Sequence, residues 1–408
     1  MHTILDTVDH AAARGRTVYV HCVGGIGRTG TVAGCWLVRH GCSGTEALAI
    51  IAERWKTVAK HIWHWKSPDY GEQREFVMAW HEQTSPGNRI DFVRLERVIR
   101  GSLLGGAVGD ARGAITNKTQ MTLFSAEAML RAEAQRRVSG TRSLEEVAFR
   151  AYQRWLRTQL DQGDSETPGS GWLMNQPELR HQRAPGKTCL ASAGVASLAL
   201  VSNNSKGCGG VMRAAPAGLF DAGGGAERAY DDGVALAHAS HRHPAGYVAA
   251  GVLAVLIGAL TEGDALDTAV HRALAAAAAH RMESPEVAES LEKAVRLAES
   301  GVAQSPELLR QLGAGRIAEE ALAIAVYCAL MADGDFARGV QLAVNHGGDS
   351  DSTGSISGSI LGAALGVAAI PGRWVERVEA REVIVQIADD LLTGWRDGVK
   401  WAEMYPAN

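Results

Sequence analysis

The chain has 408 residues, a net charge of −4 at pH 7 and 46% hydrophobic residues. That length exceeds what one compact core usually supports, so two domains are expected. The small net charge does not indicate a nucleic-acid partner or a membrane-surface partner. Six cysteines without metal-ligand spacing, and an amino terminus without an apolar signal segment, predict reduced thiols and a cytoplasmic protein.

The first segment is predicted to combine helices with one strand, and so to be a partial α/β domain. The strand is expected over Thr17–Cys22, directly before a glycine-rich loop. Helical spacing continues to Arg14 and recurs over 31–40, 45–54 and 72–80. The run Thr84–Asn88 contains proline and glycine and is interpreted as a linker, which gives domains at 1–83 and 89–408.

The loop His21–Gly30, with the sequence HCVGGIGRTG, has the parts of a phosphate-binding site. Cys22 lies between a strand and a helix N-terminus, a position that lowers a thiol pKa. Arg28 can bind phosphate oxygens in a bidentate way, and Thr29 can hydrogen-bond the sulfur. The loop resembles that of protein tyrosine and dual-specificity phosphatases, which implies Cys22 as nucleophile, Arg28 as its catalytic partner and a phosphate-bearing ligand.

Other interpretations of this segment stay open. Gly25–Gly30 also fits the dinucleotide fingerprint, with Glu46 or Glu53 as the ribose acid, but that fold needs further parallel strands. A P-loop NTPase would carry lysine where Arg28 stands. Phosphatases of this type place an aspartic general acid well upstream, whereas here the only upstream acids lie in an expected helix, at Asp6 and Asp9. The cysteine could also be merely structural.

Almost everything after the linker has helical periodicity, so the predicted fold class is mainly α. The longest apolar run, Tyr247–Leu260, is too short to span a bilayer and predicts a buried helix. Two helices carry glycine at every fourth position, at Gly101, Gly105 and Gly109 and at Gly354, Gly358, Gly362 and Gly366. Each glycine costs about 1 kcal/mol relative to alanine, so close helix pairing is expected. Pairing would bring Asp110 towards Asp349 and Asp351; the alternative is that the glycines serve packing alone.

The richest oxygen cluster is Asn345–Gly354, with the sequence NHGGDSDSTG. Its Asp-x-Asp core favours Mg²⁺, Mn²⁺ or Ca²⁺ over zinc; the alternative is a helix cap. Upstream, the polar loop Asn203–Arg213 exposes backbone N–H groups that suit a diphosphate; the alternative is that its glycines only form tight turns. His238 and His241 lack an acid or cysteine that would complete a zinc set, so His241 is interpreted as lining a pocket.

Together these stretches resemble the ADP-ribosylglycohydrolase family over residues 95–390. The matching stretches are 101–110, 116–122, 183–189, 203–213, 238–247, 318–323 and 346–354. The resemblance implies an all-helical domain that binds ADP-ribose or an ADP-ribosylated acceptor and holds one or two Mg²⁺ ions, with Mn²⁺ as a substitute. It implies metal ligands at Thr116, Asn117, Asp349, Asp351 and Ser352, with Asp349 and Asp351 also catalytic. It implies substrate contacts at Asp110, Ser205, Gly207, Gly209, Gly210, Met212 and His241.

The chain departs from the family pattern at two places. The family has Ser/Thr-Asp-Asp where this chain has Thr116, Asn117 and Lys118. An amide and an ammonium in place of two carboxylates change the local charge by three units, which weakens binding of at least one ion. The family's acid-bearing loop after Gly113 is also short here. The sequence therefore predicts a metal-dependent hydrolase that removes ADP-ribose, or alternatively a module that binds ADP-ribose with impaired or no hydrolysis.

Overall fold

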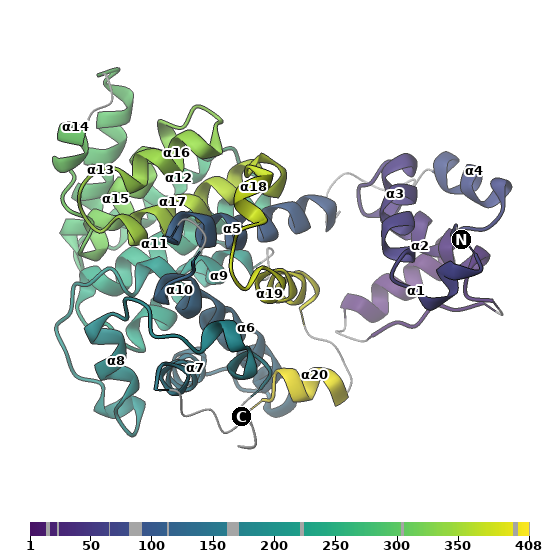
Figure 1. Cartoon of the computed structure of the whole chain (residues 1–408), viewed down its shortest axis with the longest axis horizontal. Coiled ribbons are helices and arrows are strands. Elements are labelled where there is room, and N and C mark those ends of the chain that lie inside the picture. Colours follow the sequence, from purple (N-terminus) through teal and green to yellow (C-terminus); the bar gives the residue numbers. More distant parts are fainter. Residues whose placement is uncertain are drawn as a thin grey trace. The chain divides into compact units, whose positions relative to one another are not determined.

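The computed structural model describes residues 1–13, 17–22, 24–64, 66–80, 92–111, 114–160, 171–220, 224–302, 306–394 and 399–407. These residues are mostly helical, and no strand occurs among them. The chain divides into two compact units, unit 1 at Met1–Leu95 and unit 2 at Glu96–Asn408 (Figure 1). The mainly α fold class is confirmed. The predicted linker Thr84–Asn88 lies outside the described residues.

Unit 1 packs four helices around a small apolar core. The helices are α1 (His2–Ala13), α2 (Gly27–Arg39), α3 (Gly44–Trp55) and α4 (Gly71–Ala79), with a 3₁₀ turn at Ala59–Ile62. The core contains Leu5, Cys35, Cys42, Ala47, Leu48 and Val77. Helix α3 begins with a capping box, in which Ser43 accepts from the Glu46 backbone N–H and Glu46 accepts from the Ser43 backbone N–H.

The strand expected over Thr17–Cys22 does not form. These residues lie outside any helix or strand, and no other described part of unit 1 is extended into a ladder. Alternating β-branched and aromatic residues favour a strand locally, but a strand is stable only when a neighbour completes its backbone hydrogen bonds. The segment leads into the Cys22 loop as irregular chain.

Unit 2 consists of successive helices, from α5 to α20, joined by turns and loops (Figure 1). The larger ones are α5 (Phe92–Ala111), α6 (Asn117–Ser139), α7 (Leu144–Gln159), α10 (Gly225–His238), α11 (Pro244–Glu262), α12 (Leu266–Ala279), α13 (Pro285–Glu299), α15 (Ala318–Leu330), α16 (Phe336–Val344), α17 (Ser350–Leu365) and α19 (Arg381–Thr393). The shorter ones are α8 (Lys187–Ala193), α9 (Ala215–Leu219), α14 (Pro306–Arg310), α18 (Gly372–Val375) and α20 (Val399–Met404).

Helix α11 is the central helix of unit 2. It is long and apolar enough to cross a membrane by composition, yet most of it is buried inside the protein. It contacts α9, α10, α12, α15 and α17. The buried helix expected around Tyr247–Leu260 is therefore confirmed, and its apolar surface is used by neighbouring helices.

The two glycine-bearing helices pack against each other in antiparallel fashion. A Cβ atom on Gly101, Gly105 or Gly109 of α5 would collide with the carbonyl oxygen of Gly362, Gly358 or Gly354 of α17, in that order. The reverse substitutions collide in the same way. Glycine is required here because the backbones touch. The antiparallel register places the C-terminal end of α5, with Asp110, beside the N-terminal end of α17.

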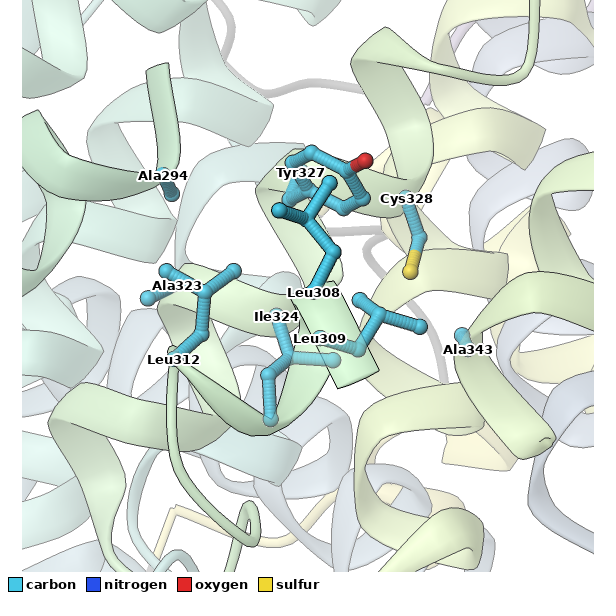
Figure 2. Close-up of a cluster of buried hydrophobic side chains, with 9 residues drawn as sticks. All are labelled: Ala294, Leu308, Leu309, Leu312, Ala323, Ile324, Tyr327, Cys328 and Ala343. Carbon is cyan, nitrogen blue, oxygen red and sulfur yellow. The ribbon is translucent and has the colours of Figure 1, made fainter. Parts of the chain in front are cut away.

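A hydrophobic cluster packs α13, α14, α15 and α16 together. Figure 2 shows residues of α13, α14, α15 and α16 converging around Leu308, Ile324 and Tyr327. The cluster positions the turn between α14 and α15, where the carbonyl oxygen of Ala314 accepts a hydrogen bond of 2.8 Å from the Asp349 backbone N–H. Through this bond the apolar core sets the position of the acidic turn that precedes α17.

Candidate functional site

Asp110 organises the start of α6. Its carboxylate accepts hydrogen bonds from the backbone N–H of Thr116 (2.7 Å) and of Thr119 (3.2 Å), and from both threonine hydroxyls. Burial raises the pKa of Asp110, and the two threonine hydroxyls, the Thr116 backbone N–H and the Lys118 charge oppose the rise. Thr116 caps α6, because its hydroxyl also accepts from the Lys118 backbone N–H. Asp110, predicted to contact substrate, is thus occupied in holding the Thr116 turn.

The Thr116–Lys118 turn and the acidic turn meet directly. Lys118 is 7% exposed, and its Nζ lies 2.6 Å from Oδ2 of Asp351, 233 positions further along the chain. Burial disfavours the charged ammonium, but the hydrogen bond to Asp351 and the charges of the nearby aspartates outweigh burial and raise the pKa of Lys118. The structure therefore brings together two of the stretches that the sequence singled out, through an ion pair.

Asp349 and Asp351 have different surroundings. Burial and the neighbouring Asp351 raise the pKa of Asp349 to about 6. Burial alone would raise the pKa of Asp351 as well, but its hydrogen bonds with Asp349 and Lys118 lower it. Oδ2 of Asp349 accepts from the Cys208 thiol (3.2 Å) and from the Ser352 hydroxyl (3.2 Å). Asp351 is the more strongly ionised member of the pair.

Helix capping does not account for this arrangement. Asp349 occupies the N-cap position of α17, but its side chain makes no capping hydrogen bond. It instead accepts from the side chains of Cys208 and Ser352, while Oδ1 of Asp351 accepts from the adjacent Ser352 backbone N–H at 3.1 Å. Both acids are partly buried and directed at side chains, so the simple capping alternative is not favoured.

The polar loop Asn203–Arg213 is fastened beside the acidic turn. Gly207 forms an isolated antiparallel bridge with Ile317, and Cys208 N–H donates to the Arg316 carbonyl oxygen at 3.1 Å. Ser205 accepts from the Gly207 backbone N–H and shares a hydrogen bond with the Thr188 hydroxyl. These contacts hold the loop so that Cys208 reaches Asp349. Met212, the predicted pocket residue, is buried.

The glycines of this loop are needed for close packing. A Cβ on Gly209 would lie 2.9 Å from Nε2 of His241, and one on Gly210 would lie 2.9 Å from the Gly246 carbonyl oxygen. Neither glycine has a positive φ, so close approach, and not a tight turn, explains them. His241 is buried, and burial together with the Arg213 charge lowers its pKa to about 3, which leaves the imidazole neutral.

The other two histidines of the 238–247 stretch point to separate partners. His238 Nδ1 contacts Glu145 at 2.9 Å, and His243 Nδ1 accepts from the Ala245 backbone N–H at 3.1 Å. They therefore do not form a metal site with His241. Within the described residues, no three His, Cys, Asp or Glu side chains are grouped to hold a metal ion.

The sequence predicted one or two Mg²⁺ ions, and the residues present do not fit a two-ion site. The position that would carry the second acid is Lys118, whose ammonium already lies on Asp351. Only Asp349 and Asp351 remain as carboxylate ligands. Asn117, which could offer an amide oxygen, is 1% exposed, and its Oδ1 has no hydrogen-bond partner in the described part of the chain. A divalent ion at Asp351 would have to displace the lysine or lie against it.

In unit 1 the Cys22 loop forms a thiolate site. The Cys22 backbone N–H donates to the Thr29 hydroxyl (3.0 Å), and the Gly25 backbone N–H donates to the Cys22 sulfur (3.2 Å). The hydrogen bonds from Thr29, with those from the Gly25 and Ile26 backbones, lower the pKa of Cys22 to about 6. Cys22 is partly exposed, whereas the other five cysteines are buried. Arg28 is exposed in the first turn of α2.

Asp9 is used for structure, away from this loop. Its carboxylate accepts from Trp36 Nε1 (2.7 Å) and Arg39 Nη1 (3.0 Å) and lies 3.3 Å from His40 Nε2. These partners stand at the C-terminal end of α2, on the order of 13 Å from the N-terminal end that faces the loop, at 1.5 Å rise per residue. Asp9 cannot reach a ligand at Cys22 and so does not supply a general acid.

Sequence reasoning missed three residues that touch these sites. Cys208 contacts Asp349, and Thr119 contacts Asp110; both lie inside stretches that were singled out, but neither carries a distinguishing local signal. Lys60, from the 3₁₀ turn of unit 1, donates to the Gly24 carbonyl oxygen at 2.8 Å and adds positive charge beside the Cys22 loop. Only the folded chain relates Lys60 to that loop.

Comparison with known proteins shows the family of the larger unit and supports the fold. The model of the ADP-ribosylglycohydrolase family matches residues 93–399. The model described as "Swiss Army Knife protein, DSP-PTPase phosphatase domain" matches residues 1–75. A solved structure titled "ADP-ribosylglycohydrolase-related protein complex" is similar at 23% identity and a TM-score of 0.52, covering 74% of this chain and 98% of that chain, which supports the fold. No curated protein matched the sequence.

Proposed function

The chain belongs to the ADP-ribosylglycohydrolase family, and on that premise we propose that unit 2 hydrolyses the bond between ADP-ribose and a modified acceptor. The observation that carries the proposal is the meeting of the Thr116–Lys118 turn with the Asp349–Ser352 turn through the Lys118–Asp351 contact. In the reaction a water oxygen bonds to the anomeric carbon, the bond to the acceptor breaks, and a proton passes to the acceptor. Asp349 and Asp351 are the carboxylates available to accept the water proton.

The substrate fits the groups that line this region. The loop Asn203–Arg213 presents backbone next to the acidic turn, and backbone N–H groups suit a diphosphate. The neutral His241 behind Gly209 adds no charge, so the loop relies on backbone donors and on Lys206, which is paired with Glu286 at 2.6 Å. The family generally uses divalent metal ions. Because the residues here do not fit two such ions, no step of this reaction is assigned to a metal.

The test is release of ADP-ribose from ADP-ribosylated proteins and nucleic acids by the full chain. We expect release by the wild type and a loss of roughly 100-fold or more in Asp349→Asn and Asp351→Asn, because each removes a carboxylate beside the reacting bond. Asp335→Asn is the matched control, because Asp335 only caps α16 and asparagine caps a helix equally well. Equal release by all four proteins would exclude these carboxylates.

A second candidate is favoured by one observation, the Lys118 ammonium on Asp351. An ion pair at this carboxylate weakens it as a base, so the site would bind ADP-ribose without cleaving it. Calorimetry distinguishes the two functions. Saturable binding of ADP-ribose without release supports the binding module, release supports the hydrolase, and the absence of both would refute both.

For unit 1 we propose that the Cys22 loop binds a phosphate-bearing ligand. The lowered Cys22 pKa, the exposed Arg28 and the nearby Lys60 support an anion site. Asp9 is held at the far end of α2, so slow turnover of a phosphomonoester is expected. Cys22→Ser should abolish turnover while keeping the size of the side chain. Turnover unchanged by Cys22→Ser would exclude the loop as the active site.

A further inference from the structure

Lys118 occupies a position where the family would place an acid. Its ammonium makes one hydrogen bond to the described residues, to Asp351, although an ammonium has three N–H donors. The side chain is 9% exposed and its partner Asp351 is 28% exposed, so a ligand bound at this pair can reach the remaining donors. Lys118 is therefore a preorganised hydrogen-bond donor that can bind a ligand oxygen beside the two carboxylates.

The neighbouring residue, Asn117, has a buried acceptor that lacks a donor among the described residues. Asn117 is 99% buried, because its exposed fraction is 1%, and its Oδ1 accepts no hydrogen bond within the described residues. A buried acceptor without a donor is rare in folded proteins, and a bound ligand is one way in which it is satisfied. A ligand hydroxyl would donate to Asn117 Oδ1, and a ligand oxygen would accept from Lys118 Nζ.

Charge disfavours a two-ion site. The carboxylates of Asp110, Asp349 and Asp351 and the Lys118 ammonium sum to −2, so two Mg²⁺ ions would bring the sum to +2. A divalent ion would also compete with Lys118 for the same Asp351 oxygen. A fixed cation has the further advantage that it is already ordered before the ligand arrives.

We infer that Lys118 acts as a built-in cation in place of a divalent ion, and that Lys118 and Asn117 together bind neighbouring hydroxyl oxygens of a sugar, here the ribose of ADP-ribose. The identification of the sugar rests on the proposed function, whereas the replacement of the ion rests on the Lys118–Asp351 contact alone. Metal-independent ligand binding is the measurable consequence.

The experiment titrates the full chain with Mn²⁺ alone, and then with ADP-ribose in EDTA and in Mg²⁺, by calorimetry. The wild type should show no saturable Mn²⁺ site, and its ADP-ribose dissociation constant should agree within about twofold between EDTA and Mg²⁺. Lys118→Met should weaken ADP-ribose binding roughly 10-fold to 100-fold, as expected for loss of a charged hydrogen bond. Lys293→Met is the matched control, because Lys293 is exposed and its one hydrogen bond to the described residues goes to the Gln311 carbonyl oxygen.

The reverse substitution sharpens the test. The double variant Asn117→Asp with Lys118→Asp should gain a saturable Mn²⁺ site and bind ADP-ribose only when metal is present. Lys118→Arg, which keeps the charge, should show no saturable Mn²⁺ site. This variant can be tested even if Lys118→Met does not fold. Saturable Mn²⁺ binding by the wild type that Asp351→Asn removes would overturn the inference. Absence of ADP-ribose binding in every condition would refute the proposed function instead, and the Mn²⁺ titration would still report on Lys118.

Discussion

The candidate sites of units 1 and 2 depart from active enzymes in opposite ways. Unit 1 has a reactive group, the Cys22 thiol with its lowered pKa, but the upstream acid Asp9 is held at the other end of α2. Unit 2 keeps the surrounding framework, from Asp110 to the loop that carries Cys208, but has a positive charge at one central position. In unit 1 the upstream acid Asp9 is not beside the reactive thiol, whereas in unit 2 the cation Lys118 stands where an acid was expected.

The two sites also differ in how they depend on the fold. The Cys22 loop draws its main hydrogen bonds from Thr29 and Gly25, within one short stretch of chain that is partly exposed. The unit 2 site is assembled from the ends of α5, α6 and α17. It also includes the Asn203–Arg213 loop, which is held by the bridge between Gly207 and Ile317. Substitutions should therefore cost much stability in unit 2 and mainly alter reactivity in unit 1.

The largest expected effect comes from Gly358→Ala. The added Cβ would collide with the Gly105 carbonyl oxygen, so α5 and α17 must separate. Overpacking costs about 1–3 kcal/mol even where side chains can adjust; against rigid backbone we expect a loss of at least about 3 kcal/mol in the free energy of unfolding, measured by urea denaturation. Gly372→Ala is the control, because a Cβ there meets no neighbouring atom. Equal stability of the two variants would show that the helices are not in contact.

The next effect is that of Asp110→Asn. All four contacts of the carboxylate come from donors, so the amide NH₂ would face donors of Thr116 or Thr119. Leaving buried groups unpaired costs about 1–3 kcal/mol, and we expect a loss of about 2 kcal/mol. Thr119→Val, which removes one hydroxyl contact, should cost about half as much. Urea denaturation measures both; a neutral Asp110→Asn would mean that the Thr116 turn does not depend on Asp110.

A smaller effect is expected in unit 1 from Asp9→Asn. The change weakens the contacts with Trp36 and Arg39, so α1 and α2 should open more readily by about 1 kcal/mol. Hydrogen exchange of α2 amides measures this opening. Glu53→Gln, at an exposed ion pair, should change it by less than about 0.5 kcal/mol. Turnover of a phosphomonoester should be the same in Asp9→Asn and wild type; a large loss would make Asp9 the missing acid.

The smallest change in stability, and a clear change in reactivity, should follow Thr29→Val. With a Cys22 pKa of about 6, the thiol is mostly ionised at pH 7, and the rate of alkylation by iodoacetamide should rise through pH 6 and then level off. Loss of the Thr29 hydrogen bond should move this midpoint upward by roughly one pH unit. Thr31→Val is the control, because among the described residues the Thr31 hydroxyl donates to the Gly27 carbonyl oxygen and not to Cys22. Mass spectrometry of the Cys22 peptide follows the reaction; a midpoint near 8 in the wild type would contradict the loop geometry.

Local patterns predicted the helices of unit 1 closely, including α3 and α4, because amphipathic spacing and capping residues act within one turn of the chain. The strand at Thr17–Cys22 was wrong for the complementary reason, since its stability depends on a neighbour that a local pattern does not include. The glycine repeats predicted the pairing of α5 and α17, because a repeated absence of side chains on one face has few other uses.

The sequence by itself determined which chemical groups this protein has: a cysteine loop, an Asp-x-Asp turn, and an amide and an ammonium at two positions where acids were expected. Only the tertiary structure decided that the Lys118 ammonium contacts Asp351, that the Cys208 thiol contacts Asp349, and that Asp9 is remote from Cys22. Periodicity fixes which face of a helix is buried, but the distance between two side chains hundreds of positions apart depends on how whole helices cross. Charges interact through that distance, so the character of the site is a property of the packing.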